Sequence, residues 1–557
     1  MDTTASYSVP VQAEALFWKG ILENPLMGHL PQELRSLGRL VDFDGNSRPL
    51  IMFNWRWAES IAALKALEAT MLNHLLTRKY GIDPVRITIN TDHSSCFIMS
   101  TALARVVEEK PAEFYINVQR PPESLHRMLA TGLYKTCDKR FYHIHGSLNP
   151  DQTLTALGLP LEGKVEDNFD DVVRRIQNQV SKFDSVTLDE RMNSEYRQAG
   201  TTVMSSAEYF ATSHGQQSGK IGLYELSREP SSMQPPSWWP ENDSMRSSPK
   251  RPLAGLRVVD LTRVIAGPTI TASLAEMGAS VLRITGPHII DFPNVFHDLN
   301  WGKWNAHLDL RQAADQDRLR SLISDADVVV DGYRPGVMER FGFGRTAIFD
   351  LVNARNRGIV HVRENCYGWH GPWASRSGWQ GISDACCGIS TEFGRAMGLN
   401  EPVTPPFPNS DRCTGVIGCA AVLHALVERA ERGGSYGVDA SLNYYSQWLV
   451  RSCGTYEDSV WNGMWASHGS PVFRHYDNTR KTVPAMLQLI EGHNGGFDIS
   501  TVLQEYNSVA VGITVSKVKP VARYENDTVE LRYNIGARGN GVDNAVWPED
   551  LGVEVIR

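Results

Sequence analysis

The sequence predicts an α/β protein with a doubly wound parallel sheet as its large domain and a smaller α+β domain beside it. Two observations indicate the sheet. Four short apolar runs, LRVVDL, SVLRIT, ADVVVDGY and GIVHVREN, follow one another between residues 256 and 365, and segments of helical spacing separate them. Strands that alternate with helices are typical of βαβ units with right-handed crossovers. A third observation indicates more than one domain: the chain has 557 residues, which is longer than a chain built around one hydrophobic core normally is.

The predicted elements follow in order from the first apolar run, at 256–261. The segment PTITASLAEMGA then has helical spacing and is opened by Pro268, and the second run follows it. Further helices are expected near 315–324 and 346–355. The binding crevice of such a sheet lies at the carboxyl ends of its strands. A nicotinamide cofactor is not expected, because LTRVIAGP after the first strand has one glycine where the dinucleotide fingerprint has three.

The chain divides into four predicted parts. Residues 228–252 are rich in Pro and Ser and lack an apolar period, so they are predicted to be a linker. Residues 1–227 form an N-terminal part with a helix–strand block and a small-domain region. Residues 253–449 form the large domain, and residues 450–557 form a C-terminal extension to which no chemical role is assigned.

Composition excludes several classes of function. A net charge of −8 gives no basic field for nucleic acid. Apolar runs are shorter than the roughly 20 residues of a membrane span, and MDTTASYSVP has no leader pattern, so a cytoplasmic protein is expected. The eight cysteines, including Cys386 and Cys387, are expected to be buried thiols. No metal site is expected, because strand alternation explains the spacing of His143 and His145.

A long helix, CTGVIGCAAVLHALVERAER, leads through a glycine turn into the strand VDASL. Near the N-terminus, WAESIAALKALEATMLNHLLTRK leads through YGIDP into VRITIN. The shared order of helix, turn and strand suggests a diverged internal duplication, and chance similarity explains a single such pair equally well.

Asp411 is the candidate nucleophile. It stands in NSDRCTG at the start of the long helix, where unpaired backbone amides and the helix dipole favour an ionised carboxylate. From local sequence alone, the favoured interpretation is that Asp411 or Ser410 is a helix N-cap. The two roles are compatible, because an ionised carboxylate beside a crevice can attack a thioester and form a mixed anhydride.

Four blocks between Pro252 and about Leu449 resemble the family III CoA-transferases, the group that includes formyl-CoA transferase and 2-methylacyl-CoA racemase. They are PLAGLRVVDLTRVIAGP with LAEMGASVLRI, AHLDLR with ADVVVDGYRPGVMERFGFG, GIVHVRENCYGWHGPW, and SDRCTG with the helix that follows. The blocks occur in the order of the family.

The resemblance implies roles for individual residues. Asp411 would be the nucleophile, and Val264 and Ile265 would line the acyl and pantetheine site. The remaining positions that the resemblance assigns to CoA contacts are Leu308, Arg311, Gly332, Tyr333, Val337 and Arg340. Arginine suits phosphate and Tyr333 suits adenine, although each arginine alone would be expected to be a solvated surface charge. CoA and acyl-CoA enter as substrates, and no permanently bound cofactor is implied.

Two departures from the family pattern affect this assignment. Trp379 and Gln380 stand where transferases often have an aromatic residue and an acid, and racemases a histidine and an acid. Neither side chain is an acid or a base, so racemase chemistry is not expected. Gly286 replaces an arginine near the adenine end, which weakens the expectation for nucleotide binding.

The N-terminal part resembles the small domain of the same family in YKTCDKRFYHIHGSLNPDQTLTALGLP and in residues 183–216. The order of the family is therefore reversed here. The duplicated block has no aspartate in the region of Asn54 to Trp57, so one active site per chain is expected. Family members form interlocked dimers, so the resemblance implies a homodimer. Alternatively, the rearranged chain could supply both halves of such a dimer within one molecule.

The function that follows is CoA transfer from an acyl-CoA to a small carboxylic acid, through a mixed anhydride and an aspartyl-CoA thioester at Asp411. Two alternatives stay open. One is isomerase or lyase chemistry on the same acyl-CoA, and the other is a binding or scaffold protein that has lost turnover.

Overall fold

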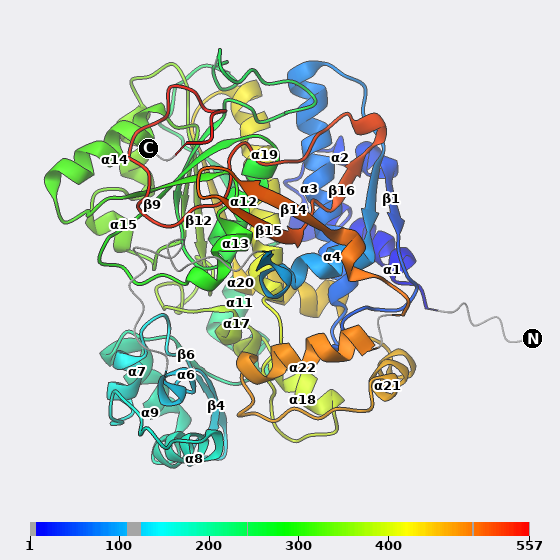
Figure 1. Cartoon of the computed structure of the whole chain (residues 1–557), viewed down its shortest axis with the longest axis vertical. Helices are drawn as coiled ribbons and strands as arrows, with labels where there is room; N and C mark the ends of the chain where they lie inside the picture. Colours follow the sequence, from blue (N-terminus) through cyan, green and yellow to red (C-terminus); the bar gives the residue numbers. More distant parts are fainter. Residues whose placement is uncertain (1–6, 108–123, 242, 493–494, 556–557) are drawn as a thin grey trace, which may run out of the picture.

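The structure is a computed structural model that describes residues 7–107, 124–241, 243–492 and 495–555 (Figure 1). Residues 1–6, which are part of the segment on which the leader prediction rests, lie outside the described residues.

The largest sheet has seven strands in the order β10-β9-β8-β11-β12-β13-β7. Six of them are parallel: β8 (Arg257–Leu261), β9 (Ser280–Thr285), β10 (Lys303–His307), β11 (Val328–Asp331), β12 (Val360–Asn365) and β13 (Tyr436–Ser441). The edge strand β7 (Tyr224–Arg228) is antiparallel to β13. The chain order of the strands reverses between β8 and β11, so the predicted doubly wound sheet is confirmed, with its switch point there.

Helices cover both faces of this sheet. The side chains of Val258, Val330 and Val362 point to the face covered by α12 (Ala266–Glu276) and α19 (Asn409–Arg432). Their alternate neighbours point to the face covered by α14 (Ala313–Asp325) and α16 (Arg345–Val352). Helix α19 is long and apolar enough to cross a membrane, but 89% of its most apolar window is buried inside the protein. It is therefore a core helix.

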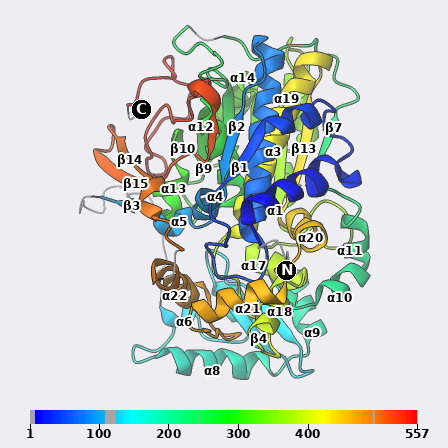
Figure 2. The ribbon, with the colours of Figure 1, turned by 90° about the vertical axis from the view of Figure 1, so that its right-hand side faces the viewer.

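The N-terminal part is packed against the large sheet. Helix α3 (Trp57–Tyr80) lies along α19, and the two helices run side by side in both views (Figures 1 and 2). Strands β1 (Val41–Asp44) and β2 (Ile87–Asn90) are parallel, and α4 (Thr91–Ile98) follows β2. The order β1, α3, β2, α4 is similar to the order β12, α19, β13 and α20 (Leu442–Trp448), except that α17 (Gln380–Cys386) and α18 (Ile389–Ala396) lie between β12 and α19. The internal duplication stays a prediction.

A separate small lobe has its own core. Strands β4 (Gly132–Lys135), β5 (Phe141–Ile144) and β6 (Gly200–Thr202) form an antiparallel sheet, and α7 (Asp151–Ala156), α8 (Phe169–Val180) and α9 (Ser185–Glu190) pack on it. This lobe is the cyan part of Figure 1. It is the smaller α+β domain that the sequence predicts.

The predicted linker and C-terminal extension are packed segments of the fold. Within 228–252, Trp239 is buried and its Nε1 donates to the carbonyl oxygen of Ala254. Beyond residue 449, β16 (Ala522–Tyr524) joins β2, and β14 (Leu503–Ser508) and β15 (Ile513–Val518) form a sheet with β3 (Arg105–Val106). Helices α21 (Asp458–Ser467) and α22 (Thr479–Gly492) precede these strands. One hydrophobic core unites residues from all three major parts, so the proposed boundaries do not separate independent cores.

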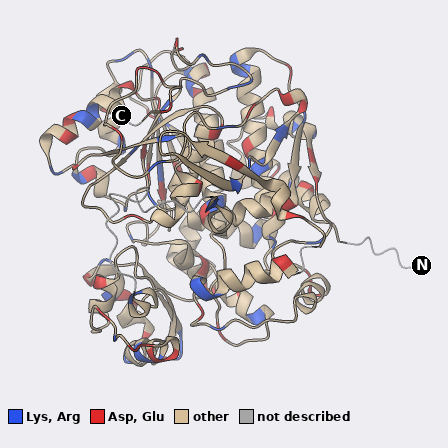
Figure 3. Cartoon of the chain, viewed as in Figure 1, with Lys and Arg blue, Asp and Glu red and all other residues tan. Residues whose placement is uncertain are grey.

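The remaining described helices are short. They are α1 (Val9–Leu16), α2 (Leu34–Leu37), α5 (Ser100–Leu103), α6 (Leu125–Met128), α10 (Ser206–Ala211), α11 (Ser213–Ser218), α13 (Phe296–Leu299), α15 (Val337–Arg340), α17 (Gln380–Cys386) and α18 (Ile389–Ala396). Figure 3 shows that acidic and basic residues are interspersed along the chain.

Candidate active site

The loop between β8 and α12 has a strained backbone. Val264 has φ of +71°, a conformation that β-branched residues rarely adopt. Its neighbour Arg263 donates from Nη1 to the carbonyl oxygen of Ile290 at 2.6 Å, and its guanidinium lies 5.3 Å from the ring centre of Tyr333. Strain of this kind persists only where surrounding contacts hold it, and it is concentrated at functional sites.

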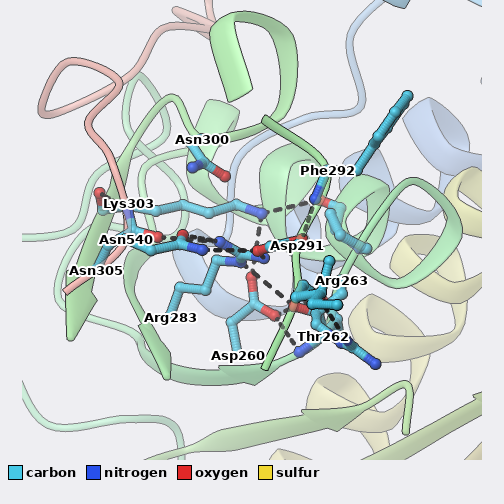
Figure 4. A network of polar contacts seen from close by, with 12 residues as sticks. Asp260, Thr262, Arg263, Arg283, Asp291, Phe292, Asn300, Lys303, Asn305 and Asn540 are labelled. Atoms are coloured by element: carbon cyan, nitrogen blue, oxygen red, sulfur yellow. Dashed lines mark hydrogen bonds and ion pairs between the residues drawn. The ribbon is translucent and has the colours of Figure 1, made fainter. Parts of the chain in front are cut away.

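A buried network of charges supports this loop from below (Figure 4). Asp260 accepts hydrogen bonds from the Thr262 backbone and from Lys303 Nζ, both at 3.0 Å. Arg283 pairs with Asp291 at 2.7 Å. Two anions and two cations balance one another, which is the condition under which buried charges are tolerated. Burial lowers the pKa of Lys303 to about 8. The network fixes Thr262 and therefore the start of the strained loop.

A cavity of about 490 Å³ opens at the carboxyl ends of β8 and β11, at the switch point of the sheet. This volume lies in the range typical of small-molecule sites. Asp411, Val264, Ile265, Gly332, Tyr333 and Val337, all predicted from the sequence, line it together. Residues 147–149 of the small lobe line the opposite wall, so the site lies between two lobes.

Three other predicted CoA contacts do not line this cavity. Leu308 is buried in the core behind α14. Arg311 makes two hydrogen bonds to the Asp309 carboxylate, at 2.8 and 2.7 Å, and Arg340 is exposed at the end of α15. The arginines that do line the cavity are Arg263, Arg334 and Arg376. Sequence analysis missed them, because isolated arginines in loops resemble ordinary surface charges.

Asp411 is the third residue of α19, and its side chain has no hydrogen-bond partner within the described chain. The N-cap interpretation is therefore wrong: Pro408 precedes the helix, and the hydroxyl of Ser410 is buried without a partner. The expectation of a strongly ionised carboxylate is also corrected. Burial raises the pKa of Asp411 to about 7, against the lowering effect of Arg412. Desolvation thus outweighs the charge of Arg412.

The start of α12 supplies free hydrogen-bond donors. Within the described chain, the backbone N–H groups of Val264, Ile265 and Ala266 have no acceptor, as is usual for a first helical turn. Gly415 lets α19 approach this turn closely, because a Cβ there would lie 2.3 Å from Thr269 Cβ and 2.9 Å from the Ala266 oxygen. Two helix starts therefore meet at the cavity. Such amides can stabilise an oxyanion that forms beside Asp411.

The small lobe is joined to the cavity rim by aromatic and polar contacts. The rings of His145 and Trp379 are stacked, with centres 5.1 Å apart and planes at 3°. Trp379 Nε1 and Arg334 Nη2 both donate to the Ser147 hydroxyl, at 3.2 and 3.3 Å. Burial lowers the pKa of His145, which keeps its ring neutral and suited to stacking. Trp379 is therefore a contact between the lobes.

Gln380 has a structural role. Its Nε2 donates to the Phe407 carbonyl oxygen at 2.7 Å and to the Asp384 carboxylate at 3.1 Å. Burial raises the pKa of Asp384 to about 8, with a further contribution from Asp411. Gln380 thus holds the segment before α19 in place. It is not one of the described residues that line the cavity.

Glu364 is a cavity residue that sequence analysis missed. It ends the row Val360, Val362, Glu364 on the α19 face of β12, where strand alternation predicts another apolar residue. This charged residue in an apolar row was the signal in the sequence that could have identified Glu364. The exclusion of acid/base chemistry considered Trp379 and Gln380 alone, so it overlooked this second carboxyl group.

Comparison with known proteins identifies the family of the chain. The model of CoA-transferase family III matches residues 253–470. Acetyl-coenzyme A transferase nodX of Hypoxylon pulicicidum is 55% identical over 571 residues, which cover 100% of this chain and 96% of that protein.

The chain belongs to the family III CoA-transferases.

This CoA-transferase is also 32% identical over 421 residues to an acyl-CoA transferase of Gibberella moniliformis, covering 73% of each chain. A crystal structure of Rv3272 from Mycobacterium tuberculosis is 30% identical, with a TM-score of 0.32 over 36% of this chain and 56% of that one. The full-length match to the Hypoxylon protein means that the order of parts in this transferase is shared with that relative. CoA thioesters are accordingly its substrates.

Proposed function

We propose that this enzyme transfers CoA from an acyl-CoA to a small carboxylic acid through covalent intermediates on Asp411. One observation carries the proposal: Asp411 lies in the cavity beside the amides at the start of α12, and among the described residues neither has a hydrogen-bond partner. A carboxylate in this setting is available as a nucleophile.

The proposed first half-reaction has two steps. A carboxylate oxygen of Asp411 attacks the thioester carbon, the C–S bond breaks, and the CoA thiolate leaves with the electron pair. The thiolate then attacks the side-chain carbonyl carbon of Asp411 in the mixed anhydride. The donor acid leaves as a carboxylate, and an aspartyl-CoA thioester forms. The amides of Val264, Ile265 and Ala266 would stabilise the oxyanions.

The second half-reaction reverses these steps with the acceptor acid. Its carboxylate attacks the aspartyl thioester, and the released thiolate attacks the acyl carbon of the new anhydride. Asp411 is regenerated and no net proton is consumed. Because the Hypoxylon relative is named an acetyl-CoA transferase, we propose acetyl-CoA as the first donor to examine.

The cavity rim supports binding of an anionic cofactor. Arg263 and Arg334 donate to neutral oxygens of Ile290, Arg197 and Ser147 and form no ion pair within the described chain. Their charge is therefore available to CoA phosphates, and Tyr333 offers a surface for the adenine.

Trapping with hydroxylamine tests the covalent steps. The enzyme is incubated with acetyl-CoA and hydroxylamine, and peptides are then mapped by mass spectrometry. A hydroxamate on Asp411 is expected, and Asp411→Asn should form none. An enzyme that turns over while Asp411 stays unmodified would refute the covalent mechanism.

A homodimer in the cytoplasm also stays a proposal. The duplicated N-terminal part offers a single-chain alternative to the dimer, and light scattering of the purified enzyme distinguishes the two masses.

A further inference from the structure

Glu364 reaches the cavity because of its place on β12. It ends the row of side chains that faces α19, and it lines the same cavity as Asp411. Gly332, at the end of the neighbouring strand β11, has no side chain to cover it: a Cβ there would lie 3.7 Å from Glu364 Oε2. Bound substrate therefore has access to both carboxyl groups.

No cation among the described residues forms an ion pair with Glu364, although arginines line the same cavity. Within the described chain it has no hydrogen bond or ion pair, and the titratable groups that face it are Asp411 from α19, Asp331 from β11 and the thiol of Cys366. Burial, followed by the charges of Asp411 and Asp331, raises the pKa of Glu364 to about 8. When Asp411 is ionised, a second charge beside it is unfavourable, so Glu364 keeps its proton.

Several other buried carboxylates of this protein have cationic partners. Asp260 pairs with Lys303, Asp291 with Arg283, and Asp298 with Arg412. These pairs stabilise the fold around the site. A carboxyl group left without such a partner, in a cavity, is more typical of a functional group than of a structural one.

We propose that Glu364 is a second catalytic residue, whose neutral carboxyl donates a hydrogen bond to the carbonyl oxygen of the acyl group that Asp411 attacks. This inference rests on the proposed CoA transfer. As the tetrahedral intermediate forms, negative charge builds up on that oxygen and the hydrogen bond strengthens. When the intermediate collapses, the C–S bond breaks and the proton stays on Glu364. The same donor serves the acceptor acid in the second half-reaction.

The pairing predicts a bell-shaped dependence of the transfer rate on pH. Asp411 must be ionised, so the rate rises through about pH 7. Glu364 must be protonated, so the rate falls again above about pH 8. The two groups interact, so the measured values belong to the pair.

Two substitutions of Glu364 test the proposal. Glu364→Gln keeps a donor that does not titrate, so it should retain transfer within about tenfold, keep the acid limb and lose the alkaline limb. Glu364→Val continues the apolar row and removes the donor, so kcat should fall about 10²-fold or more. Circular dichroism and the affinity for CoA should match those of the wild type in both variants.

Asp384→Asn is the matched control, since the pKa of Asp384 is also about 8 but its side chain is tied to Gln380. It should keep the alkaline limb. The inference is overturned if Glu364→Val transfers CoA at the wild-type rate, or if Glu364→Gln retains the alkaline limb. Failure of the proposed function can be distinguished from failure of this inference. In that case the wild-type enzyme itself would show no CoA transfer, or no adduct on Asp411.

Discussion

Glu59 and Asp411 occupy the same position, the third residue, of two 24-residue helices that pack against each other. Their surroundings differ. Glu59 is fully buried and accepts hydrogen bonds from the hydroxyls of Tyr7 and Tyr456, with Arg56 at 3.9 Å. The duplicated block thus has a carboxyl group, which a search for aspartate at 54–57 missed. One active site per chain stays our prediction, because the second carboxyl is sealed by two tyrosines.

Replacing Glu59 should affect stability and leave catalysis intact. Glu59→Ala removes the acceptor of two tyrosine hydroxyls and leaves a cavity, so the free energy of unfolding should fall by roughly 2–4 kcal/mol. Chemical denaturation measures this loss. At a temperature where the variant is folded, kcat for CoA transfer should equal that of the wild type, and a large loss of kcat would contradict the structural role.

Asp411→Asn should abolish transfer and stabilise the protein at alkaline pH. Burial raises the pKa of Asp411 in the folded protein to about 7, from an ordinary value of 3.8. The neutral carboxyl therefore favours folding below about pH 4, and this contribution is lost as pH rises to 7. Relative to the wild type, the variant should gain about 4 kcal/mol between pH 4 and 8, because each pKa unit corresponds to about 1.4 kcal/mol. Denaturation at both pH values measures this gain, and a gain that is independent of pH would contradict the assigned pKa.

Gly415→Ala should separate the two helix starts. The added methyl would overlap Thr269 of α12, so a loss of about 1–3 kcal/mol in stability is expected, together with a lower kcat. Gly463→Ala in α21 is the control, because no atom lies within 4 Å of the added carbon. The control should be neutral or slightly stabilising, and equal effects of the two substitutions would argue against the close approach.

Substitutions of cavity arginines should weaken CoA binding selectively. Arg334→Gln should raise the KM for acyl-CoA about tenfold, as expected when a charged hydrogen bond to phosphate is lost. Arg311→Gln should change it little, because Arg311 is engaged by Asp309. Steady-state kinetics at two salt concentrations checks both. A larger rise in KM for Arg311→Gln than for Arg334→Gln would instead support the contact between Arg311 and CoA that the resemblance implied.

Local pattern was enough to predict the parallel strands, because buried strands are short apolar runs and β8, β9, β11 and β12 are of that kind. It could not predict that β16 pairs with β2, since no local signal joins segments so far apart. The same limit applies to the site. Asp411 was found through a motif, whereas Glu364 matters only because the fold brings β12 under the start of α19.

The pairing of β16 with β2 has a consequence for biosynthesis. Helix α3 and strands β1 and β2 leave the ribosome early, but α19 and β16, which cover them, are made near the end. At about 5–20 residues per second, this delay is on the order of half a minute or more. During that time the face of α3 that packs on α19 has no native partner, so newly made chains should depend on chaperones until synthesis is complete.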